Sequence, residues 1–184
     1  MRTWFTGDTH FNHKKIVEYD ERPFKSTEHM DREIIRRWND RVKPEDTVVH
    51  LGDFGFLQGP RNFQYYRSQL NGNLVLIKGN HDGNNSMKSN IQNCVITLGG
   101  IDWWCQHEPV FQFPHNLCAH VHNLWKVSRE GDRLCINVGQ TQWDYRPILI
   151  EDILRAIADF KKSPFFLESH ETNQTKRSIR KSPF

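Results

Sequence analysis

Long hydrophobic runs are absent from this 184-residue sequence. No apolar stretch approaches the roughly 20 residues that a membrane-spanning helix requires. The amino-terminal stretch also reaches an acidic residue, Asp8, earlier than a secretory signal peptide would allow. These absences predict a protein that does not associate with membranes and that resides in the cytoplasm.

Cysteine is scarce and widely spaced. The four cysteines are Cys94, Cys105, Cys118 and Cys135, and no two of them form a C-x-x-C pair. This spacing argues against a zinc knuckle or a dithiol redox motif. We therefore expect free, buried thiols in a reducing compartment.

A large excess of charge is also missing, and the small excess that exists lies at one end. The net charge is +3; residues 161–184 hold six Lys or Arg and two Glu, a net charge of +4, which leaves −1 for residues 1–160. We predict one domain over residues 1–160 and a basic, polar tail over residues 161–184. Such a tail is compatible with nucleic-acid binding and equally with a solvated chain end.

Three segments of the first half share one design, at residues 3–10, 46–53 and 73–82. In each, a short apolar or aromatic run leads to a glycine and then to polar side chains, which predicts a buried strand with a polar end. A helix is expected over 28–38, with Thr27 as its N-cap, and a weaker one over 61–70. Alternating strands and helices predict an α/β fold with parallel pairing and right-handed crossovers.

The second half has the pattern of further strands. Residues 95–105 predict a hairpin around Gly99-Gly100, and short apolar runs follow at 117–122, 134–138 and 146–150. A closing helix is expected over 151–160.

Polar donors gather where the predicted strands end. Ligand sites of open α/β sheets form beyond the carboxyl ends of the strands. The donors at or near these ends are Asp8, His10, Asp53, Asn80, His81, Asp82, His107, His120 and His122. They are too many for one metal ion and about right for two, and mixed carboxylate and imidazole ligands suit Mn, Fe, Co, Ni or Zn. Each short motif alone is weak evidence, but their joint position is not expected by accident.

These motifs carry a family resemblance over roughly residues 1–150. The series resembles the calcineurin-like metallophosphoesterase superfamily: Asp8-x-His10, Gly52-Asp53, Gly79-Asn80-His81-Asp82, His107 and Ala119-His120-Val121-His122. A small bacterial and phage subfamily is similar at Asp8-Thr9-His10-Phe11-x-His13, Arg22-Pro23-Phe24, His50-Leu51-Gly52-Asp53-Phe54 and Asn137-Val138-Gly139. Two positions depart from the pattern, since Ala119 and Asn12 stand where glycine is common. Asn12 is expected to reshape the rim of the pocket.

The resemblance implies a four-layer αββα sandwich, in which two mixed sheets are flanked by helices and carry a dinuclear metal site at the strand carboxyl ends. Asp8, His10 and His122 would hold the first metal, and Asn80, His107 and His120 the second. Asp53 would bridge both ions, because a carboxylate can span metals roughly 3.5–4 Å apart. Manganese is the expected metal, with Ni, Fe, Co or Zn as alternatives. A phage-encoded member would work in the host cytoplasm.

The implied chemistry is hydrolysis of a phosphate ester. Two metals lower the pKa of a bridging water, and the resulting hydroxide attacks phosphorus. His81 is the expected general acid for the leaving oxygen, held by Asp82. The short chain favours an open pocket and a small phosphodiester or phosphomonoester, such as a small or cyclic nucleotide.

Several alternatives remain open at this point. His13 is either a substrate-side group or a surface histidine. Arg22 either contacts a substrate phosphate or belongs to a structural turn before Pro23. The chain could also be a nuclease or nucleic-acid phosphatase that uses its basic tail, or a non-catalytic metal-binding module. The sequence does not indicate an oligomeric state.

Overall fold

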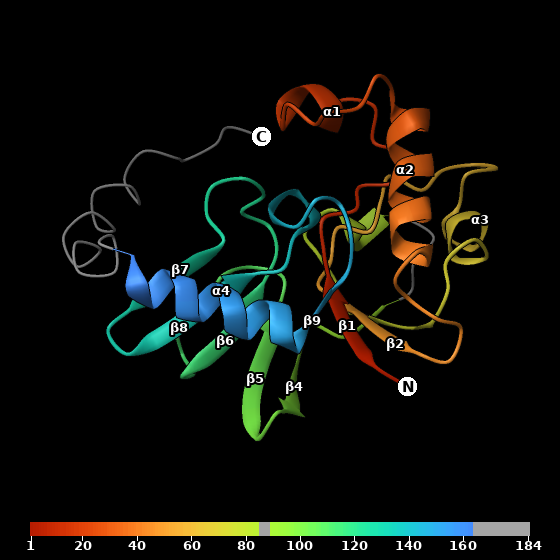
Figure 1. The fold of residues 1–184 in the computed structure, drawn as a ribbon. Coiled ribbons are helices and arrows are strands. Elements are labelled where there is room, and N and C mark those ends of the chain that lie inside the picture. The colour runs from red at the N-terminus through yellow and green to blue at the C-terminus, as the bar shows by residue number, and fades with distance from the viewer. Residues whose placement is uncertain (85–88, 164–184) are drawn as a thin grey trace.

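The computed structural model describes residues 1–84 and 89–163 (Figure 1). Most of the predicted basic tail therefore lies outside the described residues. Two β-sheets face one another and form the centre of the molecule. In chain order the elements are β1 (Thr3–Thr6), α1 (Ile16–Tyr19), α2 (Thr27–Asn39), β2 (Thr47–His50), α3 (Phe63–Arg67), β3 (Asn73–Leu76), η1 (Asp82–Asn84), β4 (Asn93–Leu98), β5 (Ile101–Gln106), β6 (His115–Cys118), β7 (Val127–Glu130), β8 (Arg133–Asn137), η2 (Gln140–Gln142), β9 (Ile148–Leu149) and α4 (Ile150–Lys162).

The first sheet has the strand order β3-β2-β1-β9. Strands β1, β2 and β3 run parallel, and β9 pairs antiparallel with β1 at the edge. The parallel pairing expected from the alternation of strands and helices is confirmed. As a result, the chain leaves β1, β2 and β3 at the same edge of the sheet.

Both faces of this sheet are buried because neighbouring residues enter different cores. Trp4 and Val48 pack with residues of α2 and α3, including Trp38. Their neighbours Phe5 and Val49 pack instead against the second sheet. Burial on both faces explains why these strands appear in the sequence as continuous apolar runs instead of alternating ones.

The second sheet has the order β4-β5-β6-β8-β7. The predicted hairpin is present as β4 and β5, which pair antiparallel around Gly99-Gly100, and both glycines have positive φ. Strands β5, β6 and β8 are parallel, while β7 pairs antiparallel with β8. The carboxyl ends of β5 and β6 therefore also lie at one edge.

The helices differ from expectation in two details. The side chain that caps α2 belongs to Ser26, whose Oγ accepts from the amide of His29 at 3.2 Å, and not to Thr27. Helix α3 is shorter than the predicted 61–70, because Arg61 forms a β-bridge with Gln58 and Asn62 caps the helix that follows. Both ends depend on local hydrogen bonds that helical periodicity does not report.

Helix α4 lies on the opposite side of the molecule from α2 and α3 (Figure 1). It packs Ile153 and Ile157 into the core between the sheets and contacts β9, β1 and β7. The α/β fold with two mixed sheets flanked by helices is thereby confirmed. Within residues 1–84 and 89–163, no helix has both the length and the apolar character needed to cross a membrane.

The four cysteines are free, as the sequence predicted. Three of them are buried and Cys94 is half-buried. The reducing compartment stays a prediction.

Asp46 anchors the amino ends of β1 and β2, far from the strand carboxyl ends. Its buried carboxylate accepts hydrogen bonds from Trp4 Nε1 at 2.9 Å, Arg2 N at 2.7 Å and Lys43 N at 3.1 Å. The bond from Trp4, supported by those two amides, lowers the pKa of Asp46 from 3.8 to about 2. A lowered folded-state pKa stabilises the fold above the unfolded value, and this stabilisation disappears as pH falls through the folded one.

We predict that Asp46→Asn lowers the free energy of unfolding at neutral pH. The difference from wild type should shrink as pH falls from 3.8 towards 2, because the wild-type carboxylate is protonated there. Chemical denaturation in a chelator, at a series of pH values, measures this difference. Asp159→Asn, at an exposed position of α4, is the matched control and should show no such trend. A gap between Asp46→Asn and wild type that does not change with pH would contradict the assignment.

Candidate metal centre

The seven predicted metal ligands all lie beyond strand carboxyl ends. Asp8 and His10 follow β1, Asp53 follows β2 and Asn80 follows β3. From the second sheet, His107 directly follows β5, while His120 and His122 follow β6. The two sheets meet at this edge, where Gly7 forms a β-bridge with Gly139.

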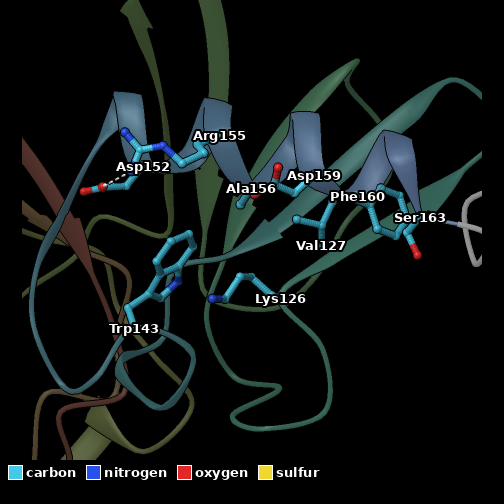
Figure 2. A pocket seen from close by; sticks show the side chains of 9 residues that line it. All are labelled: Lys126, Val127, Trp143, Asp152, Arg155, Ala156, Asp159, Phe160 and Ser163. Atoms are coloured by element: carbon cyan, nitrogen blue, oxygen red, sulfur yellow. Dashed lines mark ion pairs between the residues drawn. The ribbon is translucent and has the colours of Figure 1, made fainter.

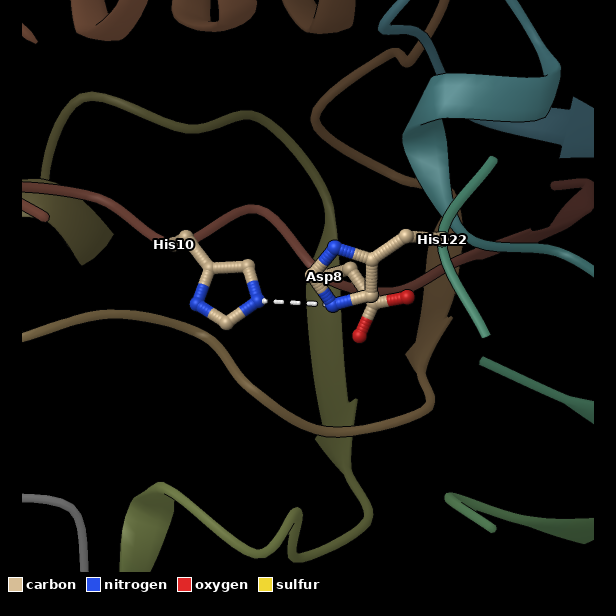
Figure 3. A group of neighbouring side chains, drawn as sticks. All are labelled: Asp8, His10 and His122. Atoms are coloured by element: carbon tan, nitrogen blue, oxygen red, sulfur yellow. Dashed lines mark hydrogen bonds between the residues drawn. The ribbon is translucent and has the colours of Figure 1, made fainter. Parts of the chain in front are cut away.

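One group of donors lies on the more buried side. Donor atoms of Asp8, His10 and His122 all lie within 4.8 Å of one another. Figure 3 shows the rings of His10 and His122 approaching through their Nε2 atoms beside the Asp8 carboxylate, with an Nε2–Nε2 distance of 3.4 Å. Asp53 Oδ2 is 3.8 Å from His10 Nε2.

A second group surrounds Asn80 Oδ1. This oxygen is 2.8 Å from His107 Nε2 and 3.1 Å from His120 Nδ1, and the two nitrogens are 3.3 Å apart. Asp53 Oδ2 is 3.4 Å from His107 Nε2. The same carboxylate oxygen of Asp53 thus lies close to both groups. Asn80 and His120 are exposed, so the second group faces solvent.

These separations fit metal coordination. Two ligands bound to one ion at about 2.0–2.1 Å, with tetrahedral or octahedral angles, lie roughly 2.8–3.4 Å apart. The Nε2–Nε2 distance in the first group and all three distances around Asn80 fall within this range. The residues present therefore fit two divalent ions that share Asp53.

Buried charge gives an independent reason to expect cations. Both carboxylate oxygens of Asp8 and Oδ2 of Asp53 are buried without a hydrogen-bond partner. Burial raises the pKa of Asp8, while burial of Asp53 is outweighed by His107, which holds the pKa of Asp53 well below its usual range. Burial would lower the pKa of His107, but the hydrogen bond and charge of Asp53 raise it to about 9. Without a metal, positive imidazolium charge is drawn towards the carboxylates.

The backbone is strained at most of the ligand positions. Five of the seven ligands have positive φ, at +53° for Asp8, +50° for His10, +55° for Asp53, +66° for His120 and +44° for His122. Such conformations cost on the order of 1–3 kcal/mol each and are kept only where the surrounding structure enforces them. Hydrogen bonds from Asp8 N to Gly52 O and from His10 N to Asp53 O, both 3.0 Å, tie the first two loops together.

A family model described as calcineurin-like phosphoesterase matches residues 1–175. The chain belongs to this family. The match extends beyond residue 160, so it includes part of the predicted tail. The resemblance carried by the short motifs is confirmed.

Related sequences and structures come from several organisms. An uncharacterized protein of Methanocaldococcus jannaschii is 30% identical over 165 residues, which is 85% of this chain and 91% of that protein. The Gene 66 protein of Mycobacterium phage L5 is 35% identical over 95 residues, half of this chain and 45% of that protein. The crystal structure of a protein of unknown function from Aquifex aeolicus matches with a TM-score of 0.64 and 26% identity, covering 84% of this chain and 98% of that one.

His81 and Asp82 have different environments. The His81 side chain is exposed, and its backbone amide donates to Asp53 Oδ1 at 2.9 Å. Asp82 is buried, and its carboxylate accepts from the amides of Asp53, Phe54 and Gly79 at 2.8–3.1 Å. These contacts give Asp82 a structural task, because they join the loops that carry Asp53 and Asn80. Its predicted role in orienting His81 stays a prediction.

The contacts of Arg22 favour the structural alternative. Its guanidinium is buried and donates to Asp8 O at 3.0 Å, Thr9 O at 3.2 Å and Asp20 Oδ2 at 3.1 Å. These bonds hold the loop of the first metal group and engage the donors that a substrate phosphate would need. Substrate binding by Arg22 therefore has no support from its contacts.

His13 and the two departures from the family pattern lie around the first loop. The His13 ring is half-buried, 5.5 Å from the His10 ring and 4.1 Å from that of Phe56. Asn12, with φ of +59°, donates from Nδ2 to Phe56 O at 2.9 Å and so fixes the rim. Ala119 is tolerated because Gly7 faces it; a Cβ on Gly7 would lie 2.6 Å from that of Ala119.

Sequence reasoning missed one residue that touches the site. Asp20 Oδ2 lies 2.5 Å from His122 Nδ1, although 102 positions separate the two residues. Asp20 immediately follows the short helix α1, and no ligand-type motif surrounds it. Only its place two residues before Arg22, in the Arg22-Pro23-Phe24 motif, could have drawn attention to it.

A separate hollow of about 540 Å³ lies beside α4 (Figure 2). Trp143, Lys126 and Phe160 line it, and Lys126 Nζ lies 4.3 Å from the centre of the Trp143 ring. Asp152 and Arg155 form an ion pair at 4.0 Å on the helix. Neither potential metal-binding group uses any of these residues, so this hollow is distinct from the metal centre.

Gly79 allows the second loop to approach Asp53. A Cβ placed on Gly79 would collide with both the backbone nitrogen and Oδ1 of Asp53. We predict that Gly79→Ala weakens binding of Mn²⁺ by at least about tenfold, because Asp53 serves both metal groups. Isothermal titration calorimetry of the metal-free protein measures the affinity.

Gly83→Ala is the matched control for this change. A Cβ at Gly83 meets nothing within 4 Å, so metal affinity should match wild type. Equal affinities for Gly79→Ala and wild type would show that the approach of Gly79 to Asp53 does not limit the site.

Proposed function

We propose that the protein is a dinuclear metal-dependent phosphoesterase. The observation that carries this proposal is the pair of donor groups around the shared carboxylate of Asp53. Membership of the calcineurin-like phosphoesterase family supports the reaction class. The proposed substrate is a small phosphodiester or phosphomonoester, such as a small or cyclic nucleotide.

Seven side chains would hold two ions, Mn²⁺ being the expected metal. Asp8, His10 and His122 would bind one and Asn80, His107 and His120 the other, with Asp53 between them. When bound, such ions supply positive charge for the phosphoryl oxygens and a nucleophilic water at neutral pH. Because Asn80 and His120 are exposed, a phosphate ester could approach from their side.

His81 is proposed to donate the proton to the leaving oxygen. Its side chain is exposed, and its ring centre lies 5.9 Å from that of His10 and 5.8 Å from that of Phe56. The hydrogen bond from His81 N to Asp53 Oδ1 fixes the backbone of His81 beside the proposed bridging carboxylate. This leaves its imidazole directed at neither the Asn80 nor the His10 group through any printed bond, as a group that serves the substrate requires.

His13 is proposed to form the substrate side of the pocket next to His81. Burial and the charges of His81 and Arg22 lower the pKa of His13 to about 4. The ring is therefore neutral at physiological pH and can donate or accept a hydrogen bond. Together with Phe56 and His81, it forms one wall beside the first metal group.

We predict different outcomes for substitutions of Asp53 and His81. Asp53→Ala should lose both metal and hydrolysis, whereas His81→Ala should keep two metals and lose rate. Loss of a general acid lowers the rate by about 10²–10⁴ for a poor leaving group, and less for a good one. Metal analysis, together with chromogenic and alkyl phosphomonoester and phosphodiester assays with added Mn, Ni or Zn, measures these effects.

His115→Ala is the control, since His115 starts β6 at the end of the strand away from the metal centre. It should retain both metal and rate. A His81→Ala variant as fast as wild type on an alkyl leaving group would refute the general-acid role. A wild type that binds two metals yet hydrolyses none of these esters would favour a non-catalytic metal-binding module.

A nucleic acid is the second candidate substrate, favoured by the basic tail. Lys161 and Lys162 end α4, and residues 164–184 add four more Lys or Arg. Under this alternative we predict that a chain ending at Ser163 binds a single-stranded oligonucleotide more weakly. It should also show a shallower salt dependence, by about 0.7 in slope per lost phosphate contact. Fluorescence anisotropy over a salt series measures both quantities, and identical curves for the two chains would exclude the tail as a binding element.

A further inference from the structure

We propose that Asp20 is a positioning residue for the first metal group, acting through His122. This inference rests on the proposed metal centre. Asp20 is the residue after α1, and its amide donates to Ile16 O at 3.1 Å, which fixes its backbone at the helix end. Its side chain contacts neither metal group's donors other than His122 in the described hydrogen bonds.

Three hydrogen bonds meet at one oxygen of Asp20. Oδ2 lies 2.5 Å from His122 Nδ1, and it accepts from Arg22 Nε at 3.2 Å and from Arg22 at the terminal nitrogen at 3.1 Å. A carboxylate held by a buried guanidinium has little freedom to rotate. Asp20 therefore offers His122 a fixed acceptor.

The bond decides which imidazole nitrogen of His122 is available to a metal. Because Asp20 Oδ2 accepts, Nδ1 of His122 must carry the proton, and this leaves the lone pair of a neutral ring on Nε2. Nε2 is the atom that lies 3.4 Å from His10 Nε2 in the first metal group. Asp20 thus selects the tautomer and the ring orientation that point a ligand atom into that group.

His107 has the same arrangement with a different acceptor. Its Nδ1 lies 2.7 Å from Leu51 O, while its Nε2 faces Asn80. A backbone carbonyl is near enough to orient His107, whereas the His122 backbone is held at a distance by Asn137, whose Nδ2 donates to His122 O at 2.8 Å. His122 therefore takes its orienting partner from a distant loop.

The connection through Arg22 extends this effect to a second ligand. Arg22 donates to Asp20 Oδ2 and also to Asp8 O at 3.0 Å. Asp20, Arg22, Asp8 and His122 thereby form one hydrogen-bonded unit around the first group. The Asn80 group is outside this unit, so loss of Asp20 should weaken one metal site and spare the other.

The test compares Asp20→Ala and Asp20→Asn with wild type and with Glu18→Ala. Glu18 is an exposed acidic residue of α1, and its loss removes the same charge without touching His122. Titration calorimetry of metal-free protein with Mn²⁺ gives the affinity and stoichiometry. Asp20→Ala should weaken one of two sites by about 10–100-fold. Asp20→Asn, which keeps an acceptor oxygen, should lose less, and Glu18→Ala should match wild type.

A spectroscopic readout separates positioning from a general structural effect. In Zn-loaded, ¹⁵N-labelled protein, the Nδ1 proton of His122 should be strongly downfield and slow to exchange, and it should lose both properties in Asp20→Ala. The Nδ1 proton of His107, bonded to Leu51 O, is the internal reference and should not change.

Three results would overturn the inference. Unchanged binding of two ions by Asp20→Ala would overturn it alone. Equal weakening of both sites, with a changed His107 signal, would assign Asp20 to general folding. A wild type that binds no divalent ion would overturn the proposed metal centre, and this inference with it.

Discussion

The close backbone junction between the two sheets is the constraint on which the rest of the site depends. Gly7, after β1, bridges to Gly139, after β8, and Asp8 N bonds Gly52 O at 3.0 Å. A Cβ on Gly139 would lie 2.5 Å from Asp8 Oδ2. Because the strand ends meet this closely, donors from both sheets reach one small space.

This convergence creates an unfavourable environment that divalent ions would relieve. Asp8 and Asp53 are buried, and five ligands adopt positive φ. Unpaired buried charge and left-handed backbone are both costly, so they persist only in a scaffold that enforces them. Here the scaffold consists of the two cores on either side of the first sheet and the Asp82 carboxylate that joins its loops.

The parts that local patterns encode were predicted well. Strands β1, β2 and β3 are short apolar runs that end in glycine or polar residues, and a parallel sheet places those ends at one edge. Helix ends were predicted less well, since Ser26 competes with its neighbour Thr27 for the capping position and β-bridge pairing of Arg61 shortens α3. Periodicity identifies the face of a helix, but hydrogen bonds to individual side chains decide where it starts.

The sequence by itself determined which donors stand at the strand ends, because strand period and glycine position are local properties. Only the tertiary structure decided how they are grouped and supported. His120 and His122 are two residues apart, yet left-handed backbone at both directs them to different groups. Asp20 meets His122 across 102 positions, and Arg22 turns inward to Asp8. Such contacts depend on how loops from distant parts of the chain pack together, which no local pattern specifies.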